Sequence, residues 1–293
     1  MRQRITPHLW FDKEAVEAAK FYSSIFKGKV KNTTTIRNTP SGDCDIVTFE
    51  LFGQEFMAMS AGPLFKFTPA ISFLVACSTK EEVEEMYNKL AKGGTPLMEL
   101  GSYPFSEKYG WTADKYGLSW QIMHMGDRKI TQRITPVMMF VGKMAGKAEE
   151  AMKLYVSVFK NAKIGDMMRY GKNAAPDKEG TVTFGSFVLE GHEFAAMDSA
   201  GPHNFTFNEA ISFIVKCDTQ KEIDYYWKLS AVPESEQCGW LKDKFGVSWQ
   251  IVPSLMEEMI TSKDEKKISK VTEAFLKMKK FDIAALKKVY EGK

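Results

Sequence analysis

Two glutamines lie near the ends of two similar sequence segments, and their side chains could take part in binding or catalysis. Gln121 belongs to WTADKYGLSWQIM, residues 111–123, and Gln250 belongs to WLKDKFGVSWQIV, residues 240–252. A buried side-chain amide can orient a ligand through its donors and its acceptor, or coordinate a metal through oxygen, but it brings no negative charge. His8, within the apolar run ITPHLWF, is a stronger metal ligand and also a hydrogen-bonding group.

Motifs of other catalytic classes are missing from the sequence. There is no Walker loop, no HExxH and no GxSxG, which argues against phosphate-loop, zinc-protease and serine-hydrolase chemistry. No glycine-rich turn follows a first strand, as would be usual in an α/β methyltransferase that binds S-adenosylmethionine. The cysteines lack metal-ligand spacing, and we expect reduced, mostly buried thiols at Cys44, Cys77, Cys217 and Cys238.

The repeated phrase belongs to a duplication of most of the chain. RITP occurs at residues 4–7 and again at residues 133–136, and GQEFMAMSAGP from Gly53 returns as GHEFAAMDSAGP from Gly191. A period this long indicates tandem domains rather than a solenoid. The second copy is shorter between its last helical pattern and the phrase that ends on Gln250. The expected organisation is a first domain at 1–128, a second domain at 129–255 and a tail at 256–293.

Each repeat predicts the same short series of elements twice. An alternating apolar run precedes a helical pattern with apolar residues at spacings of three and four, namely Val16, Ala19, Tyr22 and Phe26. Three short strands separated by turn residues follow, and the series then restarts at AISF. Each half is therefore βαβββ twice, which gives an α+β fold of four such modules.

These modules, the PHLWF opening, the AGP and AISF centre and the GWxxDKxGxSWQI close resemble the vicinal oxygen chelate superfamily of glyoxalases, bleomycin-resistance proteins and extradiol dioxygenases. Within it the chain is similar to the PhnB-like branch, which carries the label 3-demethylubiquinone-9 3-methyltransferase. The resemblance covers residues 4–125 and 133–254. It implies two glyoxalase-like domains, each a curved mixed sheet around a cavity with helices outside, followed here by C-terminal helices.

The resemblance also implies where a metal would be held. In metal-using members, four strands each supply one ligand, usually His or Glu. The matching positions are His8, Met59, Ser72 and Gln121 in the first repeat, and Val137, Met197, Ser212 and Gln250 in the second. If the register slips by two, Ala70 and Ala210 replace the serines. Thioethers and amides leave a dication almost without charge neutralisation. We therefore predict no cofactor, with His8, Gln121 and Gln250 as weak candidates for a divalent metal.

The resemblance leaves open whether each cavity forms within one repeat or across both, since related proteins pair the first module of one domain with the second module of its partner. In the second case His8 and Met59 would face Ser212 and Gln250. Trp10 would face the same cavity as His8, because side chains two apart on a strand share a face. The predicted ligand-binding residues are His8, Trp10, Met59, Ser72, Gln121, Met197, Ser212 and Gln250.

These residues also have structural explanations. A histidine on an apolar strand is more often a hydrogen-bonded pocket residue than a metal ligand, and methionines commonly fill gaps in a core. Trp120 and Trp249 alternate with the glutamines, so we expect them to face the helices as core residues. In the tail, Val271 and Phe275 lie on one helical face, and Asp282 is a predicted N-cap for a second short helix. We expect these helices to dock on the duplicated body or on a second chain.

Composition limits the class of partner. The 293 residues are 44% hydrophobic, enough for about two globular domains, and the formal charge of +3 is too close to balance to indicate nucleic acid or an anionic membrane. We predict a small-molecule ligand as partner and a cytoplasmic location, since no long apolar run or signal-peptide pattern is present. The repeats predict an intrachain pseudo-dimer and leave a homodimer open.

Together these patterns predict a small-molecule-binding protein of the glyoxalase/bleomycin-resistance fold, without a tightly bound metal and with catalysis left open. The alternative is a metal-dependent lyase or dioxygenase of the vicinal oxygen chelate type, which would use His8 with Gln121 or Gln250. A third interpretation is a structural or partner-binding protein whose cavities are filled by side chains.

Overall fold

The computed structural model describes residues 3–262 and 264–292, and over these residues the chain divides into two compact units. Unit 1 combines Met1–Lys66 with Asn208–Lys293, and unit 2 is Phe67–Phe207. The first and fourth βαβββ modules therefore make unit 1, and the second and third make unit 2. Each unit takes one module from each repeat, which is the cross-repeat arrangement of the two that the sequence left open.

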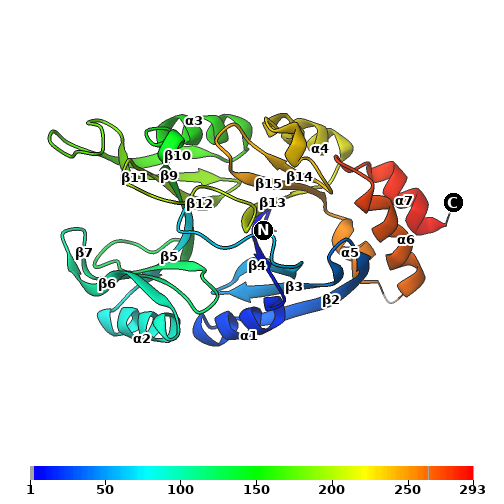
Figure 1. Cartoon of the computed structure of the whole chain (residues 1–293), viewed down its shortest axis with the longest axis horizontal. Coiled ribbons are helices and arrows are strands. Elements are labelled where there is room, and N and C mark those ends of the chain that lie inside the picture. Colours follow the sequence, from blue (N-terminus) through cyan, green and yellow to red (C-terminus); the bar gives the residue numbers. More distant parts are fainter. Residues whose placement is uncertain (1–2, 263, 293) are drawn as a thin grey trace. The chain divides into compact units, whose positions relative to one another are not determined.

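Unit 1 is built on a curved mixed sheet with strand order β14-β15-β13-β1-β4-β3-β2 (Figure 1). The helices α1, Ala15–Ile25, and α4, Gln220–Tyr226, pack against β3 and β15 respectively. The strands are β1 Ile5–Phe11, β2 Lys29–Thr39, β3 Gly42–Leu51, β4 Gln54–Ser60, β13 Ile211–Cys217, β14 Trp240–Lys242 and β15 Ser248–Pro253.

Unit 2 repeats this architecture with strand order β10-β11-β12-β9-β5-β8-β7-β6. Helix α2, Lys80–Ala91, packs on β7, and α3, Ala148–Val158, packs on β11 after the 3-10 turn η1, Gly142–Met144. The strands are β5 Ile71–Cys77, β6 Thr95–Tyr103, β7 Ser106–Ala113, β8 Ser119–His124, β9 Ile134–Val141, β10 Lys163–Arg169, β11 Val182–Leu189 and β12 His192–Ser199. The prediction of an α+β fold with curved mixed sheets is confirmed.

The two units share their strand registers, so corresponding residues can be assigned from the backbone as well as from the repeat. His8 lies opposite Met57 in unit 1, as Val137 lies opposite Ala195 in unit 2. Between β13 and β15, Ile214 pairs with Gln250, as Leu74 pairs with Gln121 between β5 and β8. These equivalences allow one unit to be compared with the other, residue by residue.

The repeated phrase that contains the glutamines is held by a buried aspartate. In unit 1 the carboxylate of Asp243 accepts hydrogen bonds from the backbone nitrogens of Phe245 and Val247, at 2.9 and 3.1 Å, and from the indole of Trp249 at 2.9 Å. Asp114 accepts the indole hydrogen bond of Trp120 in the same way, at 2.9 Å. Both tryptophans are fully buried, as predicted for core residues. The Asp-to-Trp bond fixes the strand on which the glutamine lies.

The fourth module differs from the predicted pattern, because in its described residues two strands, not three, follow the helix. The short 3-10 turns η2, Trp227–Leu229, and η3, Pro233–Ser235, take up the shorter connection before β14. The C-terminal segment lies beside the residues just before β14, at the sheet edge where the fourth module lacks a strand. The backbone nitrogens of Cys238 and Gly239 donate to the carbonyls of Met278 and Lys279, at 2.8 and 2.7 Å. In unit 2, β6 pairs with β7 at the equivalent position.

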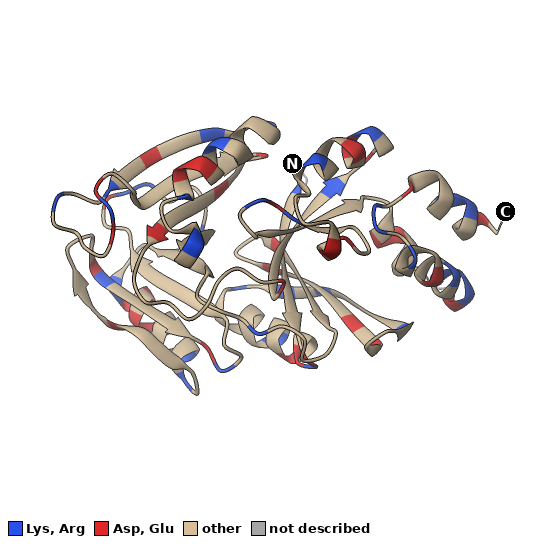
Figure 2. Cartoon of the chain, turned by 45° about the horizontal axis from the view of Figure 1, so that its top comes forward, with Lys and Arg blue, Asp and Glu red and all other residues tan. Residues whose placement is uncertain are grey.

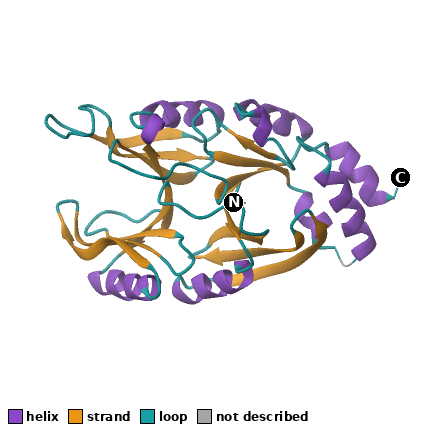
Figure 3. Ribbon diagram, in the orientation of Figure 1, coloured by secondary structure: helices purple, strands orange, loops and turns teal. Residues whose placement is uncertain are grey.

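The tail forms α5, Met256–Ile260, α6, Glu265–Leu276, and α7, Ile283–Glu291 (Figure 3). Asp282 caps α7 by accepting a hydrogen bond from the backbone nitrogen of Ala285, as predicted. The side chain of Gln220 bonds the carbonyl of Phe281 and the nitrogen of Ile283, at 3.0 and 2.9 Å. The tail thus docks on unit 1 of its own chain, while α6 and α7 carry many of their charges at exposed positions (Figure 2).

Among the described helices, none combines the length and the apolar character needed to cross a membrane.

Candidate functional site

A cavity of about 490 Å³ lies on the concave side of the sheet in unit 1. Its size falls within the range of small-molecule sites. The strands β1, β3, β4, β13 and β15 and the tail all contribute to its walls, which are mostly apolar. Representative apolar lining residues are Ile46, Met57, Met59, Ile214, Val252 and Phe281.

His8 is one of the polar residues that line this cavity. Its side chain is only 2% exposed, and its Nδ1 atom lies 3.4 Å from the hydroxyl oxygen of Ser212. Burial lowers the pKa of His8 from 6.5 to about 3, because a charged imidazole would lose its hydration there. The ring is therefore neutral at physiological pH, with one nitrogen as a donor and the other as an acceptor.

Gln250 extends the polar part of the wall across the sheet. Its Nε2 atom donates a hydrogen bond of 2.9 Å to the hydroxyl oxygen of Ser212, and the residue itself lines the cavity. Ser212 is fully buried beneath, between His8 and Gln250. The three side chains form a short hydrogen-bonded row in otherwise apolar surroundings, which suits the orientation of a ligand by one or two polar groups.

Aromatic rings form the part of the cavity next to His8. Trp240 meets the His8 ring edge-on at a centroid distance of 5.5 Å and the Trp10 ring at 6.0 Å. Trp10 packs edge-on against Phe65 at 5.1 Å and donates its indole hydrogen to the carbonyl of Gly62 at 2.8 Å. Trp10 is thereby fixed in place, and it offers the cavity a rigid apolar surface.

Lys216, a buried cation, lies at another point of the cavity wall and forms ion pairs. The amine of Lys216 hydrogen-bonds Glu55 and lies 3.6 Å from the carboxylate of Glu257 on α5. Burial works to raise the pKa of Glu55, but hydrogen bonds and charge from Lys216 and Lys31 outweigh it and lower that pKa. The positive charge of Lys216 is thus balanced by nearby carboxylates within a mostly apolar wall.

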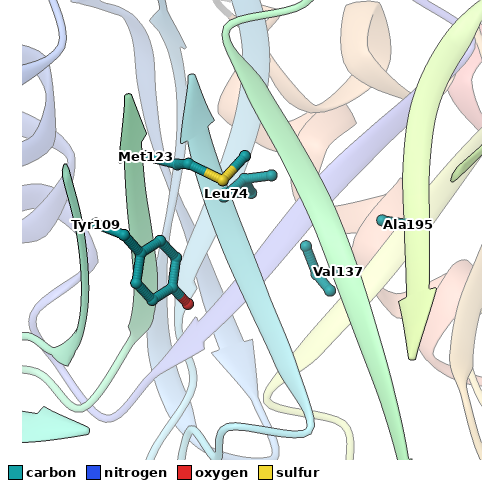
Figure 4. Packing of buried hydrophobic residues seen from close by; sticks show 5 residues of the cluster. All are labelled: Leu74, Tyr109, Met123, Val137 and Ala195. Atoms are coloured by element: carbon teal, nitrogen blue, oxygen red, sulfur yellow. The ribbon is translucent and has the colours of Figure 1, made fainter. Parts of the chain in front are cut away.

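The equivalent region of unit 2 is packed by side chains. Leu74, Tyr109, Met123, Val137 and Ala195 form a buried cluster there (Figure 4). The hydroxyl of Tyr109 donates a hydrogen bond of 2.8 Å to Oε1 of Gln121, whose Nε2 donates to Ser72 at 2.7 Å. The amide of Gln121 is therefore satisfied on both sides within the protein.

The tryptophans that open the two phrases also differ between the units. In unit 2 the indole of Trp111 donates a hydrogen bond of 2.7 Å to Ser119. In unit 1 Trp240 instead packs against His8, and within residues 3–262 and 264–292 the buried hydroxyl of the equivalent Ser248 has no hydrogen-bond partner. The change of orientation places the indole of Trp240 in the wall of the cavity.

Comparison with protein families gives two matches to one model, 3-demethylubiquinone-9 3-methyltransferase, over residues 3–123 and 132–252. The chain belongs to this family, in a duplicated form. Among solved structures, the PhnB protein from Bacillus cereus shares 44% identity over 42% of this chain and 99% of its own, with a TM-score of 0.39. Glyoxalase I from Zea mays shares 13% identity over 87% of this chain and 95% of its own, with a TM-score of 0.55. That likeness shows the glyoxalase fold.

Among the curated proteins, none matches the chain.

For this member of the 3-demethylubiquinone-9 3-methyltransferase family, the predicted site residues divide between the two units. His8, Trp10, Met59 and Gln250 line the cavity of unit 1, and Ser212 lies directly behind His8. The remaining predicted residues lie in unit 2, where Met197 packs against the buried cluster and Gln121 bonds Ser72. Their role in ligand binding stays a prediction.

Sequence reasoning missed several residues of the cavity wall. Lys216 is the clearest, because AISFIVKC carries it where the first repeat has Ala76 in AISFLVAC. A charged residue on an otherwise apolar strand was a usable signal. Trp240 was visible as the first letter of the repeated phrase, but its contact with His8 depends on a pairing of the first module with the fourth.

The residues at the metal positions that the sequence resemblance implied do not fit a divalent metal. His8, Met59, Ser212 and Gln250 provide one imidazole, a thioether, a hydroxyl and an amide, with no carboxylate. In the part of the chain that the structure describes, no group of three or more His, Cys, Asp or Glu residues is placed to hold a metal ion.

Proposed function

We propose that the chain is a binding protein for a small, largely apolar molecule, held in the cavity of unit 1 without a tightly bound metal. The observation that carries the proposal is the cavity itself, about 490 Å³ with mostly apolar walls and the hydrogen-bonded row from His8 to Gln250. Such a combination of apolar area and a few placed polar groups is typical of small-molecule sites.

Binding would draw its free energy mainly from burial of the ligand's apolar surface against methionine, isoleucine and aromatic side chains. Met57 and Met59 are unbranched and adapt to ligands of different outline. The neutral ring of His8 and the amide of Gln250 would fix the ligand's orientation, because a ligand without matching polar groups would leave these side chains unsatisfied.

The name of the family describes a methyltransferase, but the site does not support that activity for this chain. The connection between β1 and α1, residues 12–14, contains no glycine, whereas nucleotide-type cofactors are usually bound at a glycine-rich turn at this position of an α/β domain. A metal-dependent lyase or dioxygenase would need carboxylate ligands, and the strand positions of His8, Met59, Ser212 and Gln250 supply none.

The proposal can be tested with N-phenyl-1-naphthylamine, a neutral dye that becomes fluorescent in apolar surroundings. We expect saturable binding of about one dye per chain. Met59→Trp fills the cavity from β4 and is expected to weaken binding at least about tenfold, the effect of about 1.4 kcal/mol. Met168→Trp is the control. Met168 is 56% exposed on β10, so this substitution adds the same indole outside the cavity.

Absence of saturable dye binding, or equal loss in Met59→Trp and Met168→Trp, would contradict the proposal. Circular dichroism of both variants establishes that they are folded before the titrations are compared.

A further inference from the structure

The buried cluster of unit 2 is the filled counterpart of the cavity in unit 1. The repeats match each cluster residue to one residue of unit 1. The strand registers give the same match for every cluster residue but Tyr109, whose counterpart precedes β14. In the order Leu74, Tyr109, Met123, Val137 and Ala195, the counterparts are Ile214, Cys238, Val252, His8 and Met57. All five counterparts line the cavity. The same part of the fold is therefore occupied by side chains in one unit and open in the other.

Tyr109 has the largest side chain of the five cluster residues. Its phenol reaches from β7 toward the side on which Leu74 and Val137 lie (Figure 4). It is only 3% exposed, and its hydroxyl donates a hydrogen bond of 2.8 Å to Oε1 of Gln121. In unit 2 the phenol of the Tyr109 side chain therefore occupies the space that is open in unit 1.

Unit 1 keeps the acceptor for such a phenol but not the phenol itself. Gln250 has the same bond to a strand serine as Gln121, at 2.9 Å against 2.7 Å. The residue at the place of Tyr109 is Cys238, whose short side chain lines the cavity. Over the described residues of the chain, no side chain donates to Oε1 of Gln250 as Tyr109 donates to Gln121.

We infer that the cavity of unit 1 takes a small phenol, whose hydroxyl donates to Oε1 of Gln250 and whose ring lies against Ile214 and His8. This inference rests on the proposed function, since it names the ligand class of the same cavity. A ring in that place would contact the positions that Tyr109 contacts in unit 2. The cavity of about 490 Å³ has room for a ring system larger than the single ring of tyrosine, and Trp240 and Trp10 offer it aromatic surface next to His8.

The test uses a pair of probes that differ in one hydrogen-bond donor. 2-Naphthol donates through its hydroxyl, and 2-methoxynaphthalene has the same rings with no donor. Isothermal titration of the full chain is expected to show 2-naphthol bound about 3- to 10-fold more tightly, the effect of one neutral hydrogen bond in a buried site. We expect Gln250→Met to abolish this preference, because the thioether is nearly isosteric and accepts poorly.

Two further variants separate a specific contact from general damage. Gln121→Met makes the same change in unit 2 and is expected to keep the wild-type preference for 2-naphthol. Gln250→Glu keeps an acceptor oxygen and is expected to retain it as well. Equal binding of the two naphthalenes by the wild-type chain, or a preference that survives in Gln250→Met, would overturn the phenol inference while the proposed apolar site stands. If neither naphthalene nor the dye binds, both proposals fail.

Discussion

The indole nitrogen of Trp111 lies 2.7 Å from the hydroxyl oxygen of Ser119 and donates a hydrogen bond to it. The equivalent pair in the other unit, Trp240 and Ser248, does not repeat this contact, since Trp240 packs against His8 instead. One sequence phrase therefore has two side-chain arrangements in the same chain. The reason is the neighbouring side chain in space, because His8 lies beside Trp240 at the position where unit 2 has Val137.

This difference predicts opposite effects for the same substitution in the two units. Ser119→Ala should lower the free energy of unfolding by about 1 kcal/mol or more, because it leaves the indole of Trp111 without its acceptor. Ser248→Ala should be neutral or slightly stabilising, because in the described structure its buried hydroxyl has no partner to lose. Urea denaturation of both variants measures the difference. A larger loss in Ser248→Ala than in Ser119→Ala would contradict the described position of Trp240.

His8 predicts a pH dependence of stability. Its pKa is lowered from 6.5 in the unfolded chain to about 3 in the folded one by burial, so between these values the unfolded state binds the proton. The contribution of His8 to the free energy of unfolding is therefore highest above pH 6.5 and falls as the pH decreases toward 3. From pH 7 to pH 5 this one group should cost about 2 kcal/mol.

The control for that prediction is His8→Val, which copies Val137 of the other unit. Denaturation of both proteins at several pH values between 7 and 5 isolates the histidine, because the remaining titrating groups are common to the two. We expect the variant to lose about 2 kcal/mol less than the wild type over this range. Parallel pH profiles would mean that His8 is not buried as a neutral ring.

Gly239 predicts how tightly the tail is fixed to unit 1. Its φ of +83° disfavours any side chain, and a Cβ there would lie 2.5 Å from the ring of Phe281. Gly239→Ala should therefore cost about 1 to 2 kcal/mol of backbone strain and about 1 to 3 kcal/mol more from overpacking against the tail. Gly246→Ala is the matched control, since Gly246 has a φ of +90° with nothing within 4 Å of a Cβ.

We expect melting temperatures to fall more for Gly239→Ala than for Gly246→Ala, and limited proteolysis to cut first after residue 255 in the former. The tail contributes Met256, Phe275 and Phe281 to the cavity wall, so its release should also weaken binding of the dye. Equal melting temperatures for the two alanine variants would show that Phe281 does not pack on Gly239.

The lack of carboxylates at the strand positions of His8, Met59, Ser212 and Gln250 predicts weak binding of divalent metals. After incubation with zinc, nickel or manganese and removal of free ions, the wild-type chain should retain well below one ion per molecule, measured by plasma mass spectrometry. A variant with both Met59→Glu and Gln250→Glu adds two carboxylates to the cavity that His8 lines and should retain more. Stoichiometric metal in the wild-type chain at full occupancy would contradict our proposal of a metal-free site.

Part of the fold followed from the sequence because it depends on local and repeated patterns. Period-two and helical spacings predicted the modules, and the cap at Asp282 was confirmed because an N-cap depends on residues within one turn. The missing strand of the fourth module was not predicted. The shorter segment before Trp240 was visible, but a shorter segment alone does not say whether a strand or a loop is lost, nor that the tail would bond Cys238 and Gly239 instead.

The candidate site was predicted as one of two assemblies that the sequence left open, with His8 and Met59 facing Ser212 and Gln250. His8, Gln250 and Ser212 were named from strand positions, yet Lys216 and Trp240 were missed, because their place in the wall depends on strands that pair across more than two hundred residues of chain. The ion pair from Lys216 to Glu55 joins modules from the two ends of the sequence. Such long-range pairs leave no periodic signal.

By itself, the sequence determined the duplication, the α+β modules and the shortage of negative charge at the strand positions, because residue type and short-range periodicity are properties of the chain. Only the tertiary structure decided that one unit is filled by Tyr109 while the other is open beside Cys238. The physical reason is packing: whether a space is empty depends on the volumes of side chains that converge from distant strands, and no single segment contains that information.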